Sequence, residues 1–297
     1  MKTKDSTFSR VVVPLDGTVE AEGAIPLATE IADRSGGSVR LVRVHTPPRI
    51  PATCHQVLGP RIGGELKRQQ SEARRRDEAY LDDARDRPGY SPGADVSTEL
   101  LRGPVGASLI EHIRHSDATF VVMSVPLSRA GRSELGEAED TVVRGCTTPI
   151  LLLRPEGRSA RDDAQPIRRV LVPLDGTERS EAILEPAEAL ARLFGASVTL
   201  VQVVRKDDPD RSREDEARAY LDGLADGLRS RGVPCDRLVG RGSPVRAILD
   251  AATARNSDVV AMASRCRGPL TRMVLGSVSD QVLQRTSAAV LVVNQSG

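Results

Sequence analysis

The hexapeptide Val-Pro-Leu-Asp-Gly-Thr occurs twice, at residues 13–18 and 172–177, and its two aspartates, Asp16 and Asp175, lie 159 positions apart. In both copies apolar and β-branched residues come immediately before the aspartate. This pattern predicts a buried strand followed by a tight turn into a helix. A chain of 297 residues with such an offset is expected to be a tandem duplication of one α/β unit.

The remaining pattern of each half supports the same interpretation. Apolar runs alternate with helical periodicity, which favours parallel strands joined by right-handed helical crossovers. We expect two tandem doubly wound α/β domains, each with a five-stranded parallel sheet. The expected strands are residues 11–13, 38–44, 96–100, 120–123 and 150–153 in the first repeat, and 170–172, 197–203, 235–239, 259–262 and 289–293 in the second.

The boundary between the halves is predicted from composition. Residues 154–165 are polar and have no apolar face, so the expected domains are 8–155 and 168–297, with a linker at 156–167. Pro26 and Pro186 each fall within an expected first helix, where an interior proline would produce a kink. The last strand of each half is apolar and would form an exposed sheet edge. We therefore expect the two last strands to pair within one chain as an intramolecular pseudo-dimer, with further assembly into a homodimer optional.

Composition excludes several classes of protein. The 42 basic and 41 acidic residues give a net charge of +1, and aromatic residues make up only 2%, so neither a nucleic-acid surface nor an acidic membrane partner is expected. The sequence has no apolar run of bilayer length and begins with a polar segment, which favours a soluble, cytoplasmic protein. The four cysteines lack the spacing of a disulfide framework or zinc site; they are Cys54, Cys146, Cys235 and Cys266.

The first repeat has two features that the second lacks. Residues 45–64 are rich in proline and glycine and are expected to form a long loop. A polar helix follows, and its Arg74-Arg75-Arg76 run could form a phosphate or nucleic-acid patch, although the interleaved acids favour a solvated face. His112 and His115 are neighbours on a later helix and are expected to be solvated rather than metal ligands.

The expected site lies where parallel strands end. Carboxyl ends of strands in an open sheet are where ligands bind, so Asp16 and Asp175 are placed to contact one, unless each hexapeptide only caps the next helix. In the second repeat, a loop with Arg265, Arg267 and Arg272 leads to residues 276–279, Gly-Ser-Val-Ser, at the start of a helix. Unpaired backbone N–H groups and two hydroxyls there predict a phosphate site.

On these motifs the sequence resembles a tandem universal stress protein over nearly its whole length. The resemblance implies an adenine nucleotide alpha hydrolase-like, Rossmann-like fold. In the ATP-binding branch the loop is Gly, two residues, Gly, nine residues, then Gly-Ser or Gly-Thr. By resemblance, ATP, with or without Mg²⁺, would contact the second repeat at Pro173, Asp175, Val203, Met262, Ala263, Arg265, Cys266, Gly276, Ser277, Val278 and Ser279.

This chain departs from the family's loop. Ala263 and Cys266 stand where the first two glycines would be, and the Cβ of Cys266 would oppose a left-handed backbone or close approach of a phosphate. Cys266 is interpreted as a tolerated substitution, with a redox role favoured by Arg265 and Arg267 as the alternative. In the first repeat the corresponding helix begins with Glu137 and Glu139 after Gly136, and these carboxylates would repel a triphosphate. We therefore predict that the first repeat has lost nucleotide binding.

Two functional hypotheses follow from the sequence. The first is an ATP-binding stress-response sensor or adaptor with one nucleotide site, in the second repeat. The second is a tandem scaffold that binds no nucleotide and acts through protein partners, for example via residues 45–64. The sequence contains no phosphate loop ending in Gly-Lys-Ser, no nucleophile elbow and no paired carboxylates facing a base, so we do not expect a metabolic enzyme. Any hydrolysis of ATP would be slow.

Overall fold

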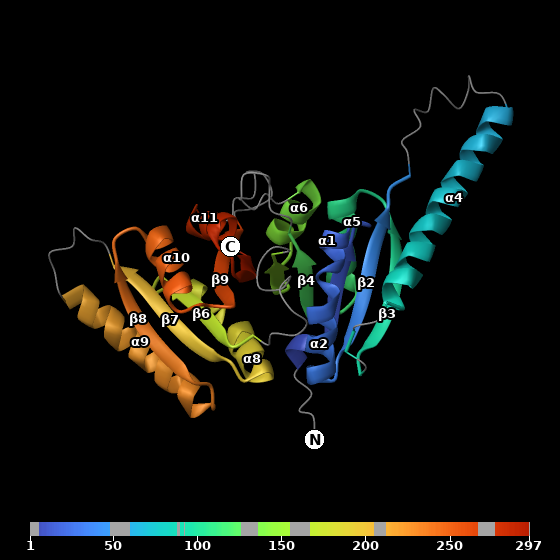
Figure 1. Ribbon diagram of the computed structural model, residues 1–297. Coiled ribbons are helices and arrows are strands. Elements are labelled where there is room, and N and C mark those ends of the chain that lie inside the picture. Colours follow the sequence, from blue (N-terminus) through green and yellow to red (C-terminus); the bar gives the residue numbers. More distant parts are fainter. Residues whose placement is uncertain are drawn as a thin grey trace.

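The computed structural model describes residues 6–47, 60–87, 90–91, 93–125, 136–154, 167–204, 212–266 and 277–296. Within these residues the chain forms the predicted alternation of strands and helices twice (Figure 1). The first repeat contains β1 (Arg10–Leu15), α1 (Val19–Glu22), α2 (Ile25–Ser35), β2 (Ser38–His45), α4 (Pro60–Arg85), β3 (Asp95–Arg102), α5 (Val105–His115), β4 (Phe120–Ser124), α6 (Glu137–Gly145) and β5 (Ile150–Leu153). The second contains β6 (Arg169–Leu174), α7 (Glu178–Glu181), α8 (Leu184–Phe194), β7 (Ser197–Val204), α9 (Ser212–Ser230), β8 (Cys235–Arg241), α10 (Pro244–Ala254), β9 (Val259–Cys266), α11 (Ser277–Arg285) and β10 (Ala289–Ser296).

The strands of both repeats join into one sheet. Among the described residues its order is β3-β2-β1-β4-β5-β10-β9-β6-β7-β8, and pairing within each repeat is parallel. The central pair, β5 and β10, is antiparallel, with Leu151 opposite Leu291. The prediction that the two last strands pair inside one chain is confirmed, and each repeat thereby covers the other's apolar edge.

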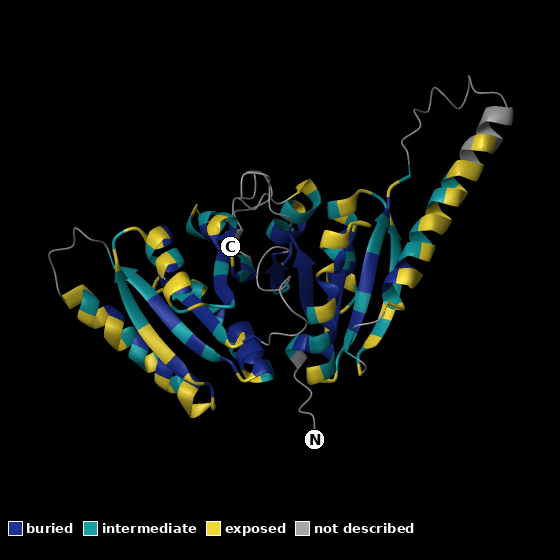
Figure 2. Cartoon of the chain, in the orientation of Figure 1, coloured by how far each residue is buried: buried dark blue, intermediate teal, exposed yellow. Residues whose placement is uncertain are grey.

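Two layers of helices cover the sheet, and buried residues concentrate in its central strands, while exposed residues lie on the outer faces of the helices and along the outermost strands β3 and β8 (Figure 2). The hydrophobic cluster under α2, α4, α8 and α9 includes Leu151 and Leu291, so it runs through both repeats. The opposite cluster lies under α5, α6, α10 and α11 and also spans the junction, through Leu152 and Val290. The two halves therefore share their cores.

Polar side chains bridge the junction in matching pairs. Arg154, directly after β5, is buried and donates a hydrogen bond to the carbonyl of Leu283 in the last turn of α11. Asn294, at the corresponding position of β10, donates to the carbonyl of Val143 in the last turn of α6 and to that of Cys146 at 2.8 Å. The last carbonyls of a helix have no partner within the helix. Each repeat therefore caps a helix of the other.

The domain bounds stay a prediction, since residues 155–166 lie outside the described residues. Arg154, in the expected first domain, and Ile167, the last residue of the expected linker, are both buried. The expected helix kinks are wrong. Pro26 and Pro186 do not kink the interior of one helix. The helix breaks before them, and they are the second residue of α2 and the third of α8, where a backbone N–H is unpaired in any case.

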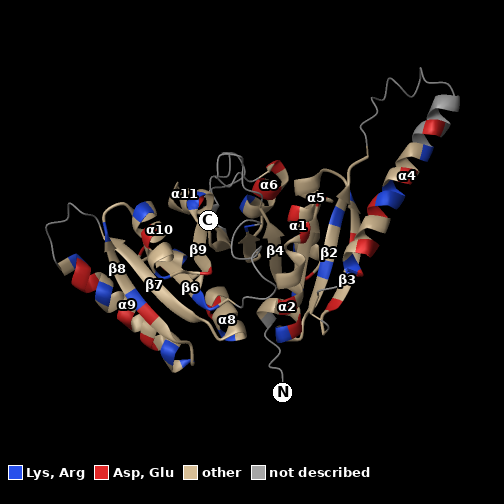
Figure 3. Ribbon diagram, in the orientation of Figure 1, with Lys and Arg blue, Asp and Glu red and all other residues tan. Residues whose placement is uncertain are grey.

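The expected loop at residues 45–64 is also too long. His45 is the last residue of β2, and α4 begins at Pro60, while residues 48–59 lie outside the described residues. Figure 1 shows α4 running beyond the ends of the neighbouring strands. Acidic and basic residues alternate along α4, as they do along α9 (Figure 3). Arg74, Arg75 and Arg76 are exposed, as expected for a solvated helix face.

Candidate functional site

The turn after β6 is held by hydrogen bonds between its own residues. One carboxylate oxygen of Asp175 accepts hydrogen bonds from the backbone N–H and the hydroxyl of Thr177, at 3.1 and 2.5 Å. The Thr177 hydroxyl accepts from the N–H of Ser180 and caps α7, and Gly176 has φ = +81°, a left-handed conformation that glycine adopts without strain.

The turn after β1 has the same arrangement. Asp16 accepts from the N–H and hydroxyl of Thr18, at 2.8 and 2.6 Å, and Thr18 caps α1. The helix-capping interpretation is therefore correct for the threonines in both repeats. Because both turns are alike, this motif alone does not tell a nucleotide-binding repeat from one that lacks a nucleotide.

Five of the other predicted residues lie together at the carboxyl edge of the second repeat. The hydroxyl of Ser279, in the first turn of α11, lies 3.4 Å from the carbonyl oxygen of Ala263 in β9 and donates to it. Val203, Met262 and Val278 belong to the hydrophobic cluster on the α10 and α11 side of the sheet. The strand order places β6, with Pro173 and Asp175 at its end, between β9 and β7. The first turn of α11 thus lies against Ala263, the fifth of the eight residues of β9.

The loop expected after Met262 begins later than predicted. β9 continues to Cys266, and Ala263, Arg265 and Cys266 pair along β10 with Val293, Gln295 and Ser296. Cys266 is therefore a strand residue, and the left-handed backbone considered for it does not occur. Arg265 also lies in the strand and not on the loop. Gly276 and residues 267–275 lie outside the described residues.

The corresponding helix of the first repeat carries more negative charge at its start. Its first turn contains Glu137, Glu139 and Asp140, whereas Asp280 is the one acid among the described residues in the first turn of α11. The Glu139 carboxylate lies against the α-carbon of Gly136, which is the N-cap residue of α6. It thus occupies the end of the helix where an anion would otherwise be attracted.

Comparison with known proteins decides the family. The model of the "Universal stress protein family" matches residues 7–154 and again residues 166–294. The chain belongs to the universal stress protein family. A universal stress protein of Mycolicibacterium smegmatis is 27% identical over 98% of each chain, and one of Mycobacterium tuberculosis is 27% identical over 96% of this chain and 97% of its own. The crystal structure of a universal stress protein from Archaeoglobus fulgidus has the same fold, with a TM-score of 0.70 at 17% identity, over 97% of this chain and 99% of that one.

One feature of this universal stress protein was not found from its sequence, because its residues come from distant segments. Arg43 of β2 donates to Asp77 of α4 at 2.7 Å, its guanidinium lies 4.8 Å above the Tyr80 ring, and it contacts Gly17. The Nδ1 of His45 forms a hydrogen bond of 2.7 Å with the other carboxylate oxygen of Asp77. Burial alone would raise the pKa of Asp77, but these hydrogen bonds lower it below its ordinary value. The second repeat has Gln202 and Val204 in place of the arginine and histidine.

The histidine expectation is half correct. His115 is exposed, but His112 is buried, with Nδ1 3.3 Å from the Glu99 carboxylate. In the part of the chain that the structure describes, no three metal-ligating side chains come together. Burial raises the pKa of the Cys146 and Cys235 thiols, the latter to about 11, which disfavours their thiolates. Nor is any helix of the described ranges both long and apolar enough to cross a bilayer.

Proposed function

We propose that this universal stress protein binds one adenine nucleotide per chain, in its second repeat, and acts as a sensor or adaptor and not as a metabolic enzyme. The observation that carries the proposal is the contact between Ser279 and Ala263, which holds the first turn of α11 against β9. Asp175 follows the end of the neighbouring strand β6, so the unpaired first-turn N–H groups of α11 would hold a phosphate on the same side of the second repeat as this carboxylate.

The difference between the two repeats supports a single site. Ser277 in α11 corresponds to Glu137 in α6, and Glu139 already lies against the N-cap of α6. A carboxylate about 4 Å from a phosphate opposes it by on the order of 4 kcal/mol per unit charge at an effective dielectric constant of 20. The adenosine would be held by Asp175 and the backbone of Val203, as the family resemblance implies.

Calorimetric titration with ATP and Mg²⁺ tests this assignment. The wild-type protein is expected to saturate near one site per chain. Ser277→Glu gives the second repeat the acidic residue of the first, and it should weaken binding by about 10³-fold, the effect of roughly 4 kcal/mol. Glu137→Ser is the matched control and should leave both affinity and stoichiometry unchanged. Equal affinity in wild type and Ser277→Glu would contradict the placement of the site.

A second candidate function is a scaffold that binds no nucleotide and acts through protein partners. Cys266 favours it, because a side chain stands where the nucleotide-binding branch has a glycine beside the phosphates. This candidate predicts no heat of ATP binding in the wild type and restored binding in Cys266→Gly. The sensor proposal instead predicts binding in both proteins, tighter in Cys266→Gly.

A further inference from the structure

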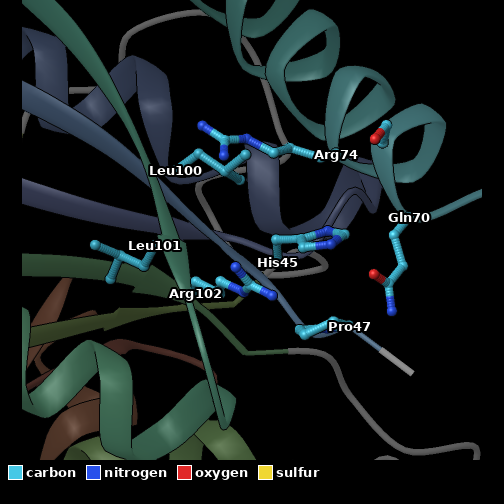
Figure 4. Close-up of a pocket in the computed structure, with 8 residues that line it drawn as sticks. His45, Pro47, Gln70, Arg74, Leu100, Leu101 and Arg102 are labelled. Carbon is cyan, nitrogen blue, oxygen red and sulfur yellow. The ribbon is translucent and has the colours of Figure 1, made fainter. Parts of the chain in front are cut away.

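A pocket of about 340 Å³ opens in the first repeat between α4 and the ends of β2 and β3 (Figure 4). It is lined by His45, Pro47, Gln70, Ser71, Arg74, Leu100, Leu101 and Arg102. Its volume lies within the range of small-molecule sites, which is roughly 300–1,000 Å³. The pocket lies on the α4 side of the sheet, whereas Val203 and Met262 of the candidate nucleotide site pack on the α5 and α10 side of theirs.

The polar groups around this pocket are mainly hydrogen-bond donors, and none of the described residues that line it is acidic. Arg102 comes from β3, Arg74 and Gln70 come from α4, and the three surround the ring of His45 (Figure 4). The His45 side chain is only 9% exposed, and Asp77 holds its Nδ1, so Nε2 is the nitrogen left for a ligand. Arg74 uses its Nε to bind Glu78 at 2.8 Å, which leaves its two terminal nitrogens.

Arg102 differs from the corresponding arginine of the second repeat. Arg241 stands at the same register of β8, next to Val204, and it forms an ion pair with Glu214 of α9. Arg102 stands next to His45 in the register of β2 and β3, and it has no ion pair with any residue that the structure describes. The second repeat thus neutralises its arginine with its own helix, while the first presents an arginine and a histidine to a pocket.

We propose that this pocket binds a small organic phosphate ester. Two guanidinium groups and an imidazole suit a phosphate, since arginine binds phosphate oxygens through paired N–H donors. Leu100 and Pro47 offer an apolar wall for the organic part, and the amide of Gln70 can bond a hydroxyl.

Calorimetric titration with ribose 5-phosphate tests the proposal, with ribose as the neutral counterpart and malonate as a dicarboxylate. We expect ribose 5-phosphate to bind and ribose not to bind. Arg102→Gln should weaken binding at least about tenfold, because it removes a charge-assisted hydrogen bond. Arg241→Gln, at the matching position of the other repeat, should leave the affinity unchanged. Arg74→Gln should also weaken binding, and thermal melts of each variant show whether it is folded.

Binding of a phosphate ester in the first repeat and binding of ATP in the second can be tested independently. Ser277→Glu, which should strongly weaken ATP binding in the second repeat, is expected to bind ribose 5-phosphate as the wild type does. Absence of ribose 5-phosphate binding in the folded wild type at millimolar concentration would overturn the inference. Equal loss of affinity in Arg102→Gln and Arg241→Gln would overturn it as well, and equal affinity for malonate would overturn the assignment to phosphate esters.

Discussion

At the scale of single residues, the junction between the repeats depends on two polar side chains whose role the sequence pattern does not predict. Arg154 directly follows the apolar strand β5, and Asn294 comes after the apolar residues of β10. Polar residues in such places are usually exposed. Arg154 also begins the polar stretch 154–165, and yet it is fully buried. Its burial lowers its pKa to about 10. Each side chain lies against the last turn of a helix from the other repeat, and the unpaired carbonyls of that turn require a hydrogen-bond donor.

The Asn294 cap can be tested directly. Asn294→Leu keeps a similar volume but leaves the carbonyls of Val143 and Cys146 without their donor. A buried acceptor without a partner costs about 1–3 kcal/mol, so the free energy of unfolding should fall by about 2 kcal/mol in urea denaturation. Ser287→Ala, at an exposed position, is the control and should change it by less than about 0.5 kcal/mol. A similar small change in Asn294→Leu would show that the cap contributes little.

A second residue-scale prediction concerns pH. Burial lowers the pKa of His112 below its ordinary value of 6.5, with an opposing effect of Glu99 and a smaller lowering effect of Arg40. Its Nε2 is buried without an acceptor among the described residues. The unfolded chain binds a proton at His112 more readily than the folded chain does. The contribution of neutral His112 to the free energy of unfolding is therefore fully present above pH 6.5, and it is lost as the pH falls toward the pKa of His112 in the folded protein.

His112→Gln should therefore lose less stability than the wild type between about pH 7.5 and about pH 5.5. The comparison is made by urea denaturation at the two pH values. His115→Gln, on the exposed face of the same helix, should retain the pH dependence of the wild type. Identical pH dependence in all three proteins would mean that His112 does not contribute to it.

At the scale of elements, the sequence predicts the strands well because most are runs rich in Val, Leu and Ile and all recur in both halves. It predicts their ends poorly. β9 extends through Arg265 and Cys266 because β10 lies beside it and completes their hydrogen bonds, although their side chains are atypical of a buried strand. The expected strand ends at residue 262, so the sequence pattern places Arg265 and Cys266 on a loop, whereas both residues lie in β9.

The prolines give an element-scale prediction. An interior proline would destabilise α8 by about 3 kcal/mol, and its replacement by alanine would recover that amount. Pro186 instead lies in the first turn, so Pro186→Ala should change the free energy of unfolding by less than about 1 kcal/mol. Ala187→Pro is the matched comparison: the Ala187 N–H donates to the Ile183 carbonyl at 3.0 Å, and its loss should cost about 3 kcal/mol. A large gain of stability in Pro186→Ala would favour the interior kink.

At the scale of the whole molecule, the pairing of the last strands follows from the sequence because each strand is an apolar edge that requires a cover. The helix contacts on the two faces of the sheet beside this strand pair cannot be predicted from the sequence, since they join segments with no shared motif. Arg34 of α2 lies 4.8 Å over the Phe194 ring of α8 on one face, and Arg144 of α6 lies 3.8 Å from Asp280 of α11 on the other. The repeats are therefore joined by a strand pair and by helices on both faces.

This junction should hold the repeats together without a covalent connection. A specific protease site inserted between residues 160 and 161 allows the chain to be cut after folding, and size-exclusion chromatography then reports the mass. The cut protein is expected to elute as one species near 31.9 kDa. Leu151→Glu combined with Leu291→Glu places two carboxylates opposite each other in the paired strands, and after cutting it should release the halves. Separation of the cut wild type into halves at micromolar concentration would show that the connecting residues, and not the shared sheet, keep the repeats together.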